Sequence, residues 1–428
     1  MSAMPAWLFV VIPVGLLLFG FPIYLILLIT ALVALQFAVA VEPTVIPTTI
    51  FGSLDSFPII AIPFFVLAGE IMGQGGIAKR IITWVLSIVG GIRGSLAITT
   101  VASSEIFGAM SGSSLGTVAA VGRLLLPALR SNGYSERFST SLISASGAIA
   151  VIIPPSLPLI IYGVVAQQPV TVLFLAGIVP AILIGTIDTI YVLAYARMKN
   201  VPRTTGPNLR TILKATKDAG WALGTIVLLF GGIYGGIFTP TEAAGMAVVY
   251  SFLVSKFIYR DITWKKLWEI TMTAAQLNGQ ILVILTAAAC YSWFLTTSGI
   301  PQQVIAAIQT YHLGQAGTLL LFNAILIGIG SFLEPAPAIL ILTPLFLPVV
   351  VALGVSPIHF GIIMAVNISL GLYTPPFGIN LFGSHSLFGV KLGMLYRGVV
   401  PFMIINAIGL LIITYVPQVS LTLPSFLH

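Results

Sequence analysis

The sequence predicts an all-α, polytopic membrane protein made of an inverted structural repeat, with two re-entrant helical hairpins and two broken helices. Of its 428 residues, 58% are hydrophobic and only 7% are charged, whereas about a quarter are charged in soluble proteins. Apolar runs of bilayer-spanning length, about 17–25 residues, recur along the chain. A segment that ends in a double proline also occurs twice. Together these observations predict the fold class.

The repeat appears when the sequence is shifted by 221 residues. The shift places Pro154-Pro155 on Pro375-Pro376 and Gly133 on Gly354, and it needs no gap across this segment. Helix breakers at matching positions in two apolar halves are typical of the binding site of a secondary transporter. We therefore divide the chain into a first repeat, residues 1–205, and a second repeat, residues 206–428.

In the first repeat, each run is assigned by its length and its breakers. The N-terminal run, 7–41, follows no basic segment and is expected to span the membrane rather than to be a cleaved signal. The run 94–107 is too short to cross, since it measures about 21 Å at 1.5 Å per residue. The predicted order is a run over 7–41 broken at Gly20-Phe21-Pro22, a polar connection over 43–58, a span over 59–73, an interfacial helix over 77–89, hairpin 1 over 93–131, a broken helix over 138–166 and a span over 170–196.

A hydrophilic segment, 197–217, separates the repeats and contains basic residues but no acid. Basic loops mark the cytoplasmic side, so we expect it to be a cytoplasmic loop. Its basic residues are Arg197, Lys199, Arg203, Arg210, Lys214 and Lys217.

The second repeat is predicted to follow the same order. Its elements are a run over 221–254 broken at Thr239-Pro240, a basic loop over 256–266, a span over 271–297, an interfacial helix over 301–311, hairpin 2 over 316–352, a broken helix over 357–388 and a span over 399–415.

The distribution of basic residues predicts that the repeats are inverted. The base of hairpin 1 has Arg93, Arg130 and Arg137, whereas the base of hairpin 2 has neither Lys nor Arg. Five spans and one hairpin per repeat place all 18 Lys and Arg in the cytoplasm and both termini outside. An odd number of spans turns the second repeat upside down, as inverted repeats require. A parallel duplication whose charges have drifted is the alternative.

Composition also excludes several classes of function. The net charge of +7 is explained by topology signals in loops, so no nucleic acid is expected as a partner. The single cysteine, Cys290, allows no disulfide within the chain, and the four histidines show no metal-ligand spacing. No catalytic triad pattern or Gly-rich phosphate loop is present, so the sequence predicts neither an enzyme nor an ATPase.

The two breaks predict an ion and substrate site. Unwound backbone at membrane depth is tolerated only where it is buried in protein or lines a cavity. Proline leaves the carbonyl four residues earlier without its helical partner, which here frees the carbonyls of Ala150, Val151, Gly371 and Leu372. Hydroxyl and carbonyl oxygens suit Na⁺, our predicted coupling ion. Its expected ligands are Ser111, Ser113, Ala150, Glu334 and Thr374. Close helix packing by small residues is the alternative for each Ser/Gly cluster.

Glu334 lies at the tip of hairpin 2, where Ser113 lies at the tip of hairpin 1. An acid at membrane depth is by default functional, although Glu334 could instead cap the following helix. Asn367 and Ser369, one turn before the second break, could add side-chain oxygens. The predicted ion- and substrate-binding residues are Ser111, Gly112, Ser113, Ala150, Ile153, Pro154, Pro155, Glu334, Pro335, Asn367, Ser369, Gly371, Thr374 and Pro375.

Five motifs give the chain a specific family resemblance. They lie at 57–72 (FPIIAIPFFVLAGEIM), 111–122 (SGSSLGTVAAVG), 152–164 (IIPPSLPLIIYGV), 236–245 (GIFTPTEAAG) and 333–348 (LEPAPAILILTPLFLP). Across nearly its whole length the chain resembles the large membrane subunit, DctM-like, of tripartite ATP-independent periplasmic (TRAP) transporters. At the tip of hairpin 2 this family more often has Asp, whereas the present chain has Glu334.

The resemblance implies an elevator-type ion transporter in the bacterial inner membrane. It implies Na⁺-coupled import of a small organic acid, of the C4-dicarboxylate or sialic acid kind. The implied partners are a small four-helix membrane subunit, which this chain leaves no room to contain, and a periplasmic substrate-binding protein. Selectivity lies largely in that binding protein, so the permease sequence does not identify the acid. Two alternatives stay open: a stand-alone dicarboxylate symporter or ion antiporter of the same superfamily, and an assembly subunit without a transport path.

Overall fold

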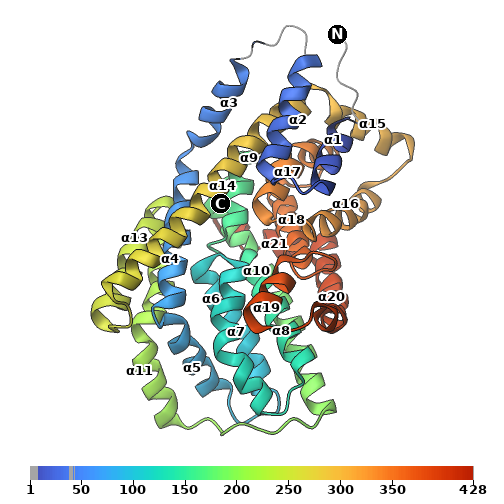
Figure 1. The fold of residues 1–428 in the computed structure, drawn as a ribbon. Coiled ribbons are helices and arrows are strands. Elements are labelled where there is room, and N and C mark those ends of the chain that lie inside the picture. Colours follow the sequence, from blue (N-terminus) through green and yellow to red (C-terminus); the bar gives the residue numbers. More distant parts are fainter. Residues whose placement is uncertain (1–7, 38–41, 43, 428) are drawn as a thin grey trace.

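The computed structural model describes residues 8–37, 42 and 44–427, and every element named within these ranges is a helix (Figure 1). Helices long and apolar enough to cross a membrane confirm the prediction of a polytopic helical membrane protein. They cover Phe57–Gln74, Val170–Met198, Pro240–Ile258, Trp264–Thr297, Pro335–Ala352 and Leu392–Tyr415.

The N-terminal helices confirm the predicted break. Helix α1 (Leu8–Leu18) ends before Gly20, whose φ of +76° favours glycine, and α2 (Ile23–Phe37) begins after Pro22. Residues 7 and 38–41 of the predicted run lie outside the described residues. The next elements are α3 (Val45–Leu54), the 3₁₀ turn η1 (Phe57–Ile60), α4 (Ala61–Gln74) and α5 (Ile77–Val89).

Hairpin 1 consists of α6 (Ser95–Ser111) and α7 (Ser114–Ser131). Gly112 turns the chain at a φ of +59°. The hydroxyl of Ser113 then caps α7 by accepting a hydrogen bond from the backbone N–H of Gly116 at 3.2 Å. Only Gly112 and Ser113 separate the two helices, which makes a tight tip.

The first broken helix consists of α8 (Glu136–Ala148), the 3₁₀ turn η2 (Ile149–Val151) and α9 (Leu157–Val165). Helix α10 (Val170–Met198) follows. In the second repeat the corresponding elements are α16 (Gln315–Gly330) and α17 (Pro335–Ala352), which form hairpin 2, then α18 (Pro357–Gly371), α19 (Ile379–Phe388) and α20 (Leu392–Tyr415). The bonds Pro154-Pro155 and Pro375-Pro376 are both cis.

Less of the basic segment between the repeats is a loop than predicted, because part of it is helical. Helix α11 (Leu209–Ile226) begins inside it, where the side chain of Asn208 accepts a hydrogen bond from the N–H of Arg210 at 3.0 Å. Ala215, Ala219 and Ala222 are buried at helical spacing. The basic residues of this helix therefore lie on its exposed face, and the connection between α10 and α11 is limited to residues 199–208.

The middle helices otherwise follow the predicted order. Thr239 and Glu242 form a reciprocal capping box at the start of α13 (Pro240–Leu253), which confirms the break predicted there. Helix α14 (Trp264–Thr297) starts earlier than predicted because the side chain of Thr263 caps it. The remaining elements are the π-helical turns η3 (Val227–Gly231) and η4 (Val254–Ile258), α12 (Gly232–Tyr234), α15 (Ile300–Thr310), α21 (Gln418–Leu421) and η5 (Pro424–Leu427).

The two hairpins have their bases at opposite ends of α20. Beside the base of hairpin 1, Arg137 donates to the carbonyl of Arg397 at 2.6 Å, near the start of α20. At the base of hairpin 2, the hydroxyl of Tyr415, the last residue of α20, donates to the carbonyl of Ala316 at 2.9 Å. Residues 397 and 415 are about 27 Å apart at 1.5 Å per residue, close to the thickness of a bilayer core. The hairpins therefore enter from opposite sides, as an inverted repeat requires.

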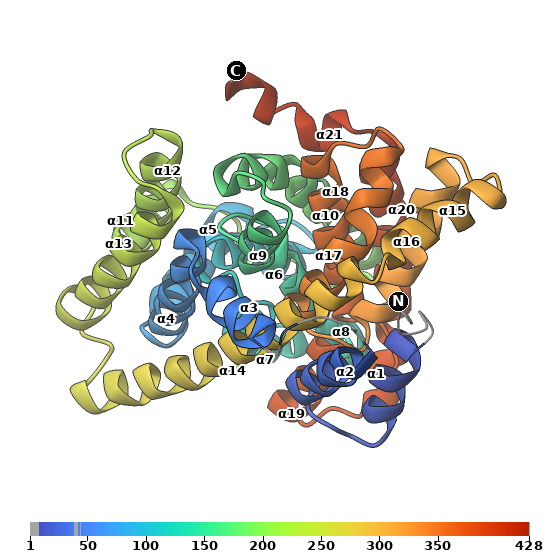
Figure 2. The same ribbon diagram turned by 90° about the horizontal axis from the view of Figure 1, so that it is seen from above.

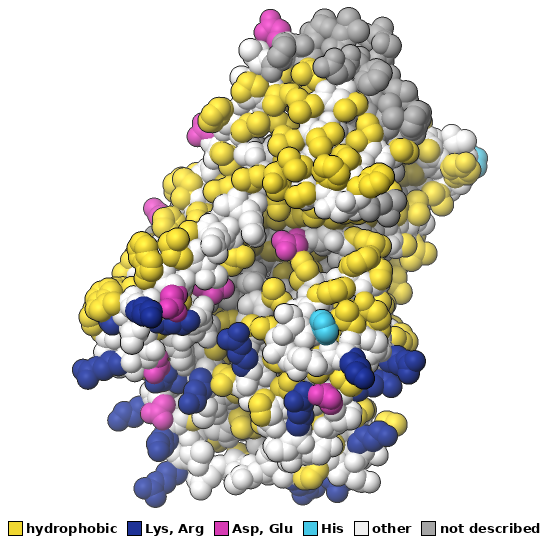
Figure 3. All heavy atoms as spheres, in the orientation of Figure 1, with side chains coloured by type: hydrophobic (Ala, Val, Ile, Leu, Met, Phe, Trp, Pro, Cys, Tyr) yellow, Lys and Arg dark blue, Asp and Glu magenta, His cyan; other side chains and the backbone are white. Residues whose placement is uncertain are grey.

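The basic residues gather at one end of the molecule on the face that Figure 3 draws, while the rest of that face is largely apolar. Hydrogen bonds bring several of these segments together: Arg93 donates to Asn200 at 2.9 Å, and Arg80 pairs with Asp261 at 2.5 Å. By the distribution of Lys and Arg, this is the end expected to face the cytoplasm.

The helices form an outer group and a central group. Figure 2 shows α4, α11 and α13 along one side of the molecule, away from α18 and α20, while α14 runs from that side toward the centre. Helix α4 packs on α13 and α14, and α11 packs on α5. Trp84 of α5 donates from its indole nitrogen to the hydroxyl of Thr216 of α11 at 3.0 Å. The predicted interfacial helix is thus held by a helix of the second repeat.

Candidate functional site

The tip of hairpin 1 is seated on the first break. A Cβ added to Gly108 would lie 2.7 Å from the Cα of Ala150, and one added to Gly112 would lie 3.0 Å from the carbonyl oxygen of Pro155. Such close approach is possible only because these positions are glycines. The predicted residues at the tip and at the first break therefore form one half-site, which we call half-site 1: Ser111, Gly112, Ser113, Ala150, Ile153, Pro154 and Pro155.

The tip of hairpin 2 is seated on the second break in the same way. A Cβ on Gly371 would lie 2.6 Å from the Cα of Gly330. The rings of Phe332 and Phe377 also pack against each other across this contact, tilted by 44° with centroids 5.1 Å apart. Half-site 2 combines Glu334 and Pro335 of the hairpin with Gly371, Thr374 and Pro375 of the broken helix.

The outer helix α4 contacts the tip of hairpin 1 through another glycine. A Cβ on Gly69 would lie 3.0 Å from both the Cα and the carbonyl oxygen of Ser111. Ser111 is 2% exposed, and its hydroxyl lies 3.3 Å from that of Thr117. Half-site 1 is therefore closed on the side of α4.

Three of the four carbonyls that we expected the prolines to free have partners within the chain. Val151 accepts from the hydroxyl of Ser156 at 2.5 Å, Gly371 accepts from the N–H of Thr374 at 2.9 Å, and Leu372 accepts from the N–H of Asn380 at 2.9 Å. In each case the chain turns back after the break and brings a donor to the vacated acceptor. The predicted ligand carbonyl of Ala150 is not among these three.

Glu334 occupies the N-cap position of α17, with φ −65° and ψ 158°, but its side chain makes no capping hydrogen bond. Ser113, at the equivalent position of hairpin 1, does cap its helix. The proposal that Glu334 serves as a helix cap is therefore not supported by the geometry. The carboxylate is not used to satisfy the backbone of its own helix.

Two other predicted residues contact elements away from the hairpin tips. Ser369 donates to the carbonyl of Ala148 at 2.8 Å and so joins the two broken helices. Asn367 donates to the side-chain oxygen of Asn323 of α16 at 2.8 Å, and Asn323 donates to the hydroxyl of Thr414 at 3.0 Å. Asn367 therefore belongs to a polar link between α16, α18 and α20.

Sequence reasoning missed the residue that ties the two half-sites together. Asn380 is fully buried in α19. Its side-chain oxygen accepts from the hydroxyl of Ser114 in hairpin 1 at 2.8 Å, and its amide donates to the carbonyl of Ser144 at 2.8 Å. The hydroxyls of Ser144 and Ser384 are 2.7 Å apart. The available signal was that Asn380 is the one side-chain amide in α19.

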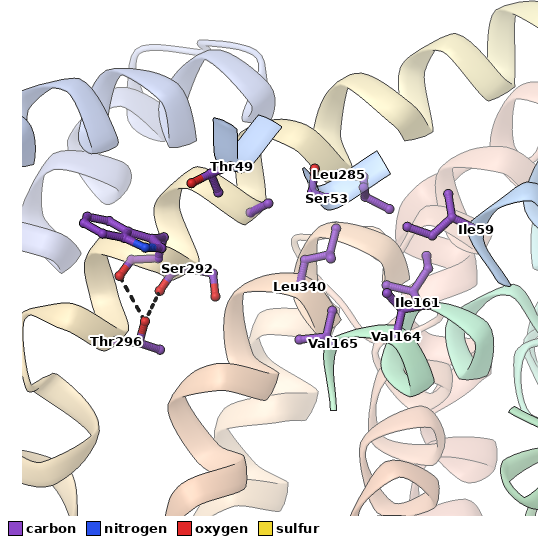
Figure 4. A pocket seen from close by; sticks show the side chains of 12 residues that line it. Thr49, Ser53, Ile59, Ile161, Val164, Val165, Leu285, Ser292, Thr296 and Leu340 are labelled. Atoms are coloured by element: carbon purple, nitrogen blue, oxygen red, sulfur yellow. Dashed lines mark hydrogen bonds between the residues drawn. The ribbon is translucent and has the colours of Figure 1, made fainter. Parts of the chain in front are cut away.

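A cavity of about 310 Å³ lies between α3, α9, α14 and α17 and is mostly apolar (Figure 4). Its lining includes Ile161, Leu285 and Leu340 but none of the predicted ion- or substrate-binding residues. At its margin the hydroxyl of Thr296 bonds to the carbonyls of Ser292 and Trp293. We therefore place the candidate site at the hairpin tips and not in this cavity.

The described residues contain no group of three or more His, Cys, Asp and Glu side chains that could hold a metal ion. A cation at the hairpin tips would therefore be bound mainly by hydroxyl and carbonyl oxygens, together with Glu334. Such a donor set suits a hard, singly charged ion better than a transition metal.

Two opposed hairpins, each seated on a broken helix within a bundle of membrane-spanning helices, define a secondary transporter. Comparison with protein families identifies which one: the model for the "Tripartite ATP-independent periplasmic transporter, DctM component" matches residues 9–419. The chain belongs to this family, the large permease subunits of TRAP transporters.

Individual relatives agree with this assignment. The chain is 39% identical over 378 residues to the C4-dicarboxylate TRAP transporter large permease protein DctM of Pseudomonas aeruginosa, covering 88% of each chain. It is 38% identical to the isethionate TRAP transporter permease protein DctMQ of Oleidesulfovibrio alaskensis, covering 95% of this chain and 64% of that protein. It is 33% identical to the ectoine TRAP transporter large permease protein TeaC of Halomonas elongata, covering 96% of each.

Solved structures share the fold at low sequence identity. The YdaH transporter of Alcanivorax borkumensis aligns with a TM-score of 0.63 at 15% identity, covering 97% of this chain and 98% of that one. This likeness supports the fold class alone.

Proposed function

We propose that this protein is the large transmembrane subunit of a TRAP transporter that imports a small organic acid across the bacterial inner membrane, driven by Na⁺. The observation that carries the proposal is the seating of each hairpin tip on a broken helix, which places helix ends and unwound backbone together at membrane depth. Helix N-termini attract anions, and carbonyl and hydroxyl oxygens bind cations. The two half-sites thus offer both kinds of contact.

The half-sites carry different polar groups, so we infer that they contribute differently to ion and substrate binding. Half-site 1 has hydroxyls at Ser111 and Ser113 and a carbonyl at Ala150, whereas half-site 2 adds the carboxylate of Glu334 and the hydroxyl of Thr374. We assign Na⁺ to these oxygens and the organic anion to the N-terminal ends of α7 and α17. The hairpins and broken helices would move together past the outer helices, in an elevator motion, with the Gly69–Ser111 contact on the sliding surface.

Substrate would reach the permease from a periplasmic binding protein, with a separate small four-helix membrane subunit completing the complex. The names of the relatives specify a C4-dicarboxylate, isethionate and ectoine, so the family accommodates different substrates on one permease fold. A C4-dicarboxylate is our first candidate because it is named for the relative that is 39% identical.

Reconstitution tests the proposal directly. The permease and its small subunit are placed in proteoliposomes with an inward Na⁺ gradient, and uptake of radiolabelled succinate, isethionate and ectoine is measured with and without the purified binding protein. We expect uptake of one of these compounds only when both the Na⁺ gradient and the binding protein are present. Uptake without a binding protein would instead favour a stand-alone symporter, and uptake that ignores the Na⁺ gradient would refute Na⁺ coupling.

A further inference from the structure

A second polar cluster lies in the membrane-spanning part of the molecule, apart from the hairpin tips. Asp188 of α10 is completely buried. Its Oδ1 accepts a hydrogen bond from the amide of Asn406 in α20 at 3.1 Å, and the same amide donates to the hydroxyl of Tyr373 at 2.9 Å. Asn406 and Tyr373 are each 1% exposed. Tyr373 directly precedes Thr374 and the second break, so the cluster adjoins half-site 2.

Hairpin 1 brings a second acid to this cluster. The carboxyl group of Glu105 in α6 lies against Gly185 of α10, in the space that a side chain at position 185 would occupy. Gly185 and Asp188 are three residues apart and share one face of α10. Two carboxyl groups from different helices therefore approach each other inside the protein.

The acids have no cationic partner. The ion pairs of the described residues do not involve Glu105 or Asp188. Helices α6, α9 and α18 contain neither Lys nor Arg. Arg197 of α10 is nine residues from Asp188, and Arg397 of α20 is nine residues from Asn406, so each lies about 13 Å away along its helix at 1.5 Å per residue. The other titratable groups on α10 and on the elements that pack against it are Tyr162, Tyr191, Tyr195, His359, Tyr396 and Tyr415, with Tyr373 at the second break. Tyr162 donates to the carbonyl of Pro357, and His359 bonds to Ser420 and Thr414.

Three oxygen atoms of the cluster are buried without a hydrogen-bond partner among the described residues: Glu105 Oε1, Asp188 Oδ2 and Asn406 Oδ1. All three are acceptors when both acids are ionised, and the hydroxyl of Tyr373, the one O–H donor of the cluster, can satisfy at most one of them. An unpaired buried acceptor destabilises the folded state, and a charged one does so more strongly. The cluster therefore lacks a positive charge or a further hydrogen-bond donor.

We propose that this cluster is a membrane-embedded proton-binding site and that Asp188 carries the proton on Oδ2. A protonated Asp188 can donate to Asn406 Oδ1 while Asn406 continues to donate to Asp188 Oδ1, which gives a paired acid–amide contact. One proton thus removes a buried negative charge and supplies one donor, and the resulting hydrogen bond joins two of the unpaired atoms, Asp188 Oδ2 and Asn406 Oδ1. The remaining carboxyl, Glu105, then faces a neutral neighbour instead of a second carboxylate.

The site is separate from the proposed Na⁺ ligands and does not depend on the proposed function. Through Asn406 and Tyr373 it connects α10 and α20 to the backbone of the second break. The charge of Asp188 is therefore positioned to influence that break.

Infrared spectroscopy of the purified protein tests the proposal without any substrate. We expect the wild-type protein at neutral pH, in buffer with choline as the cation, to show a protonated-carboxyl C=O band that shifts in D₂O. This band should be lost in Asp188→Asn, whose amide can make the same paired contact with Asn406 and so preserve the fold. It should persist in Glu105→Gln and in the control Glu136→Gln, which changes an exposed acid paired with Arg130.

A second variant keeps the test decisive if Asp188→Asn does not fold. Asn406→Ala removes the proposed acceptor of the proton, so the C=O band should shift in frequency but remain. An unshifted band in Asn406→Ala, or an equal band in wild type and Asp188→Asn, would overturn the assignment. Loss of the band in Glu105→Gln would also overturn the assignment, because the proton would then be on Glu105. Disappearance of the band when Na⁺ replaces choline would overturn it as well, because the site would then bind Na⁺ and not a proton.

Discussion

The contact between Gly371 and Gly330 gives the sharpest test of how hairpin 2 is seated on the second break. Replacing Gly371 with alanine adds a Cβ 2.6 Å from the Cα of Gly330 and 2.8 Å from its carbonyl oxygen. Both neighbours are backbone atoms, so no side chain can rotate out of the way. The hairpin must move by about 1 Å to restore ordinary contact, and overpacking of this kind costs about 1–3 kcal/mol.

Thermal unfolding of the purified protein measures this cost, and Na⁺-driven uptake measures its effect on the site. We expect Gly371→Ala to lower both the melting temperature and the uptake rate. Gly328→Ala is the matched control, because it lies in the same hairpin and its added Cβ meets nothing within 4 Å. Alanine is also the better helix former, by about 1 kcal/mol. If Gly371→Ala were as stable and active as Gly328→Ala, the close seating of the hairpin would be refuted.

Two further changes test the connection between the half-sites and their orientation. Asn380→Ala removes hydrogen bonds to Ser114 and Ser144, so we expect the free energy of unfolding to fall by about 2–4 kcal/mol. The control Ser384→Ala removes one bond, to Ser144, and should cost about 1 kcal/mol. Equal losses in the two variants would contradict the central role of Asn380. In a Cys290→Ser background, a membrane-impermeant maleimide should label Leu353→Cys from the periplasm and Asn132→Cys only after permeabilisation, and labelling of both from one side would rule out inverted repeats.

The hairpins and breaks could be predicted because their signals are local. Glycine permits the left-handed turn at Gly112 and the proline ring fixes φ at Pro155, and a shift of 221 residues repeats the double proline. The short run before the hairpin tip further excluded a crossing helix. These features depend on neighbouring residues, so a single sequence reveals them.

The start of α11 was missed because composition and periodicity disagreed. Lys214 and Lys217 favour a loop by charge, but Ala215, Ala219 and Ala222 form a buried stripe. The deciding factor was packing against α5, which is far away in the sequence. A prediction from local sequence gives the charges too much weight relative to the buried alanine stripe.

The bonds that hold the site together could not be predicted, because their partners are distant in sequence. Asn380 and Ser114 are separated by 266 residues, and Asn406 and Asp188 by 218. The carbonyls at the breaks show the same limitation. Proline predicts that Leu372 loses its helical partner, but only the folded chain shows that the N–H of Asn380 replaces it.

The central claim is that the hairpin tips bind Na⁺ with the help of Glu334, and equilibrium binding of radioactive Na⁺ to the purified protein tests it most directly. Because Glu334 makes no capping bond, Glu334→Gln should leave the fold intact. We predict at least a tenfold loss of Na⁺ affinity, equivalent to about 1.4 kcal/mol. The control Glu269→Gln, which changes an exposed acid near Lys266, should bind as wild type. Unchanged Na⁺ affinity in Glu334→Gln would contradict the account.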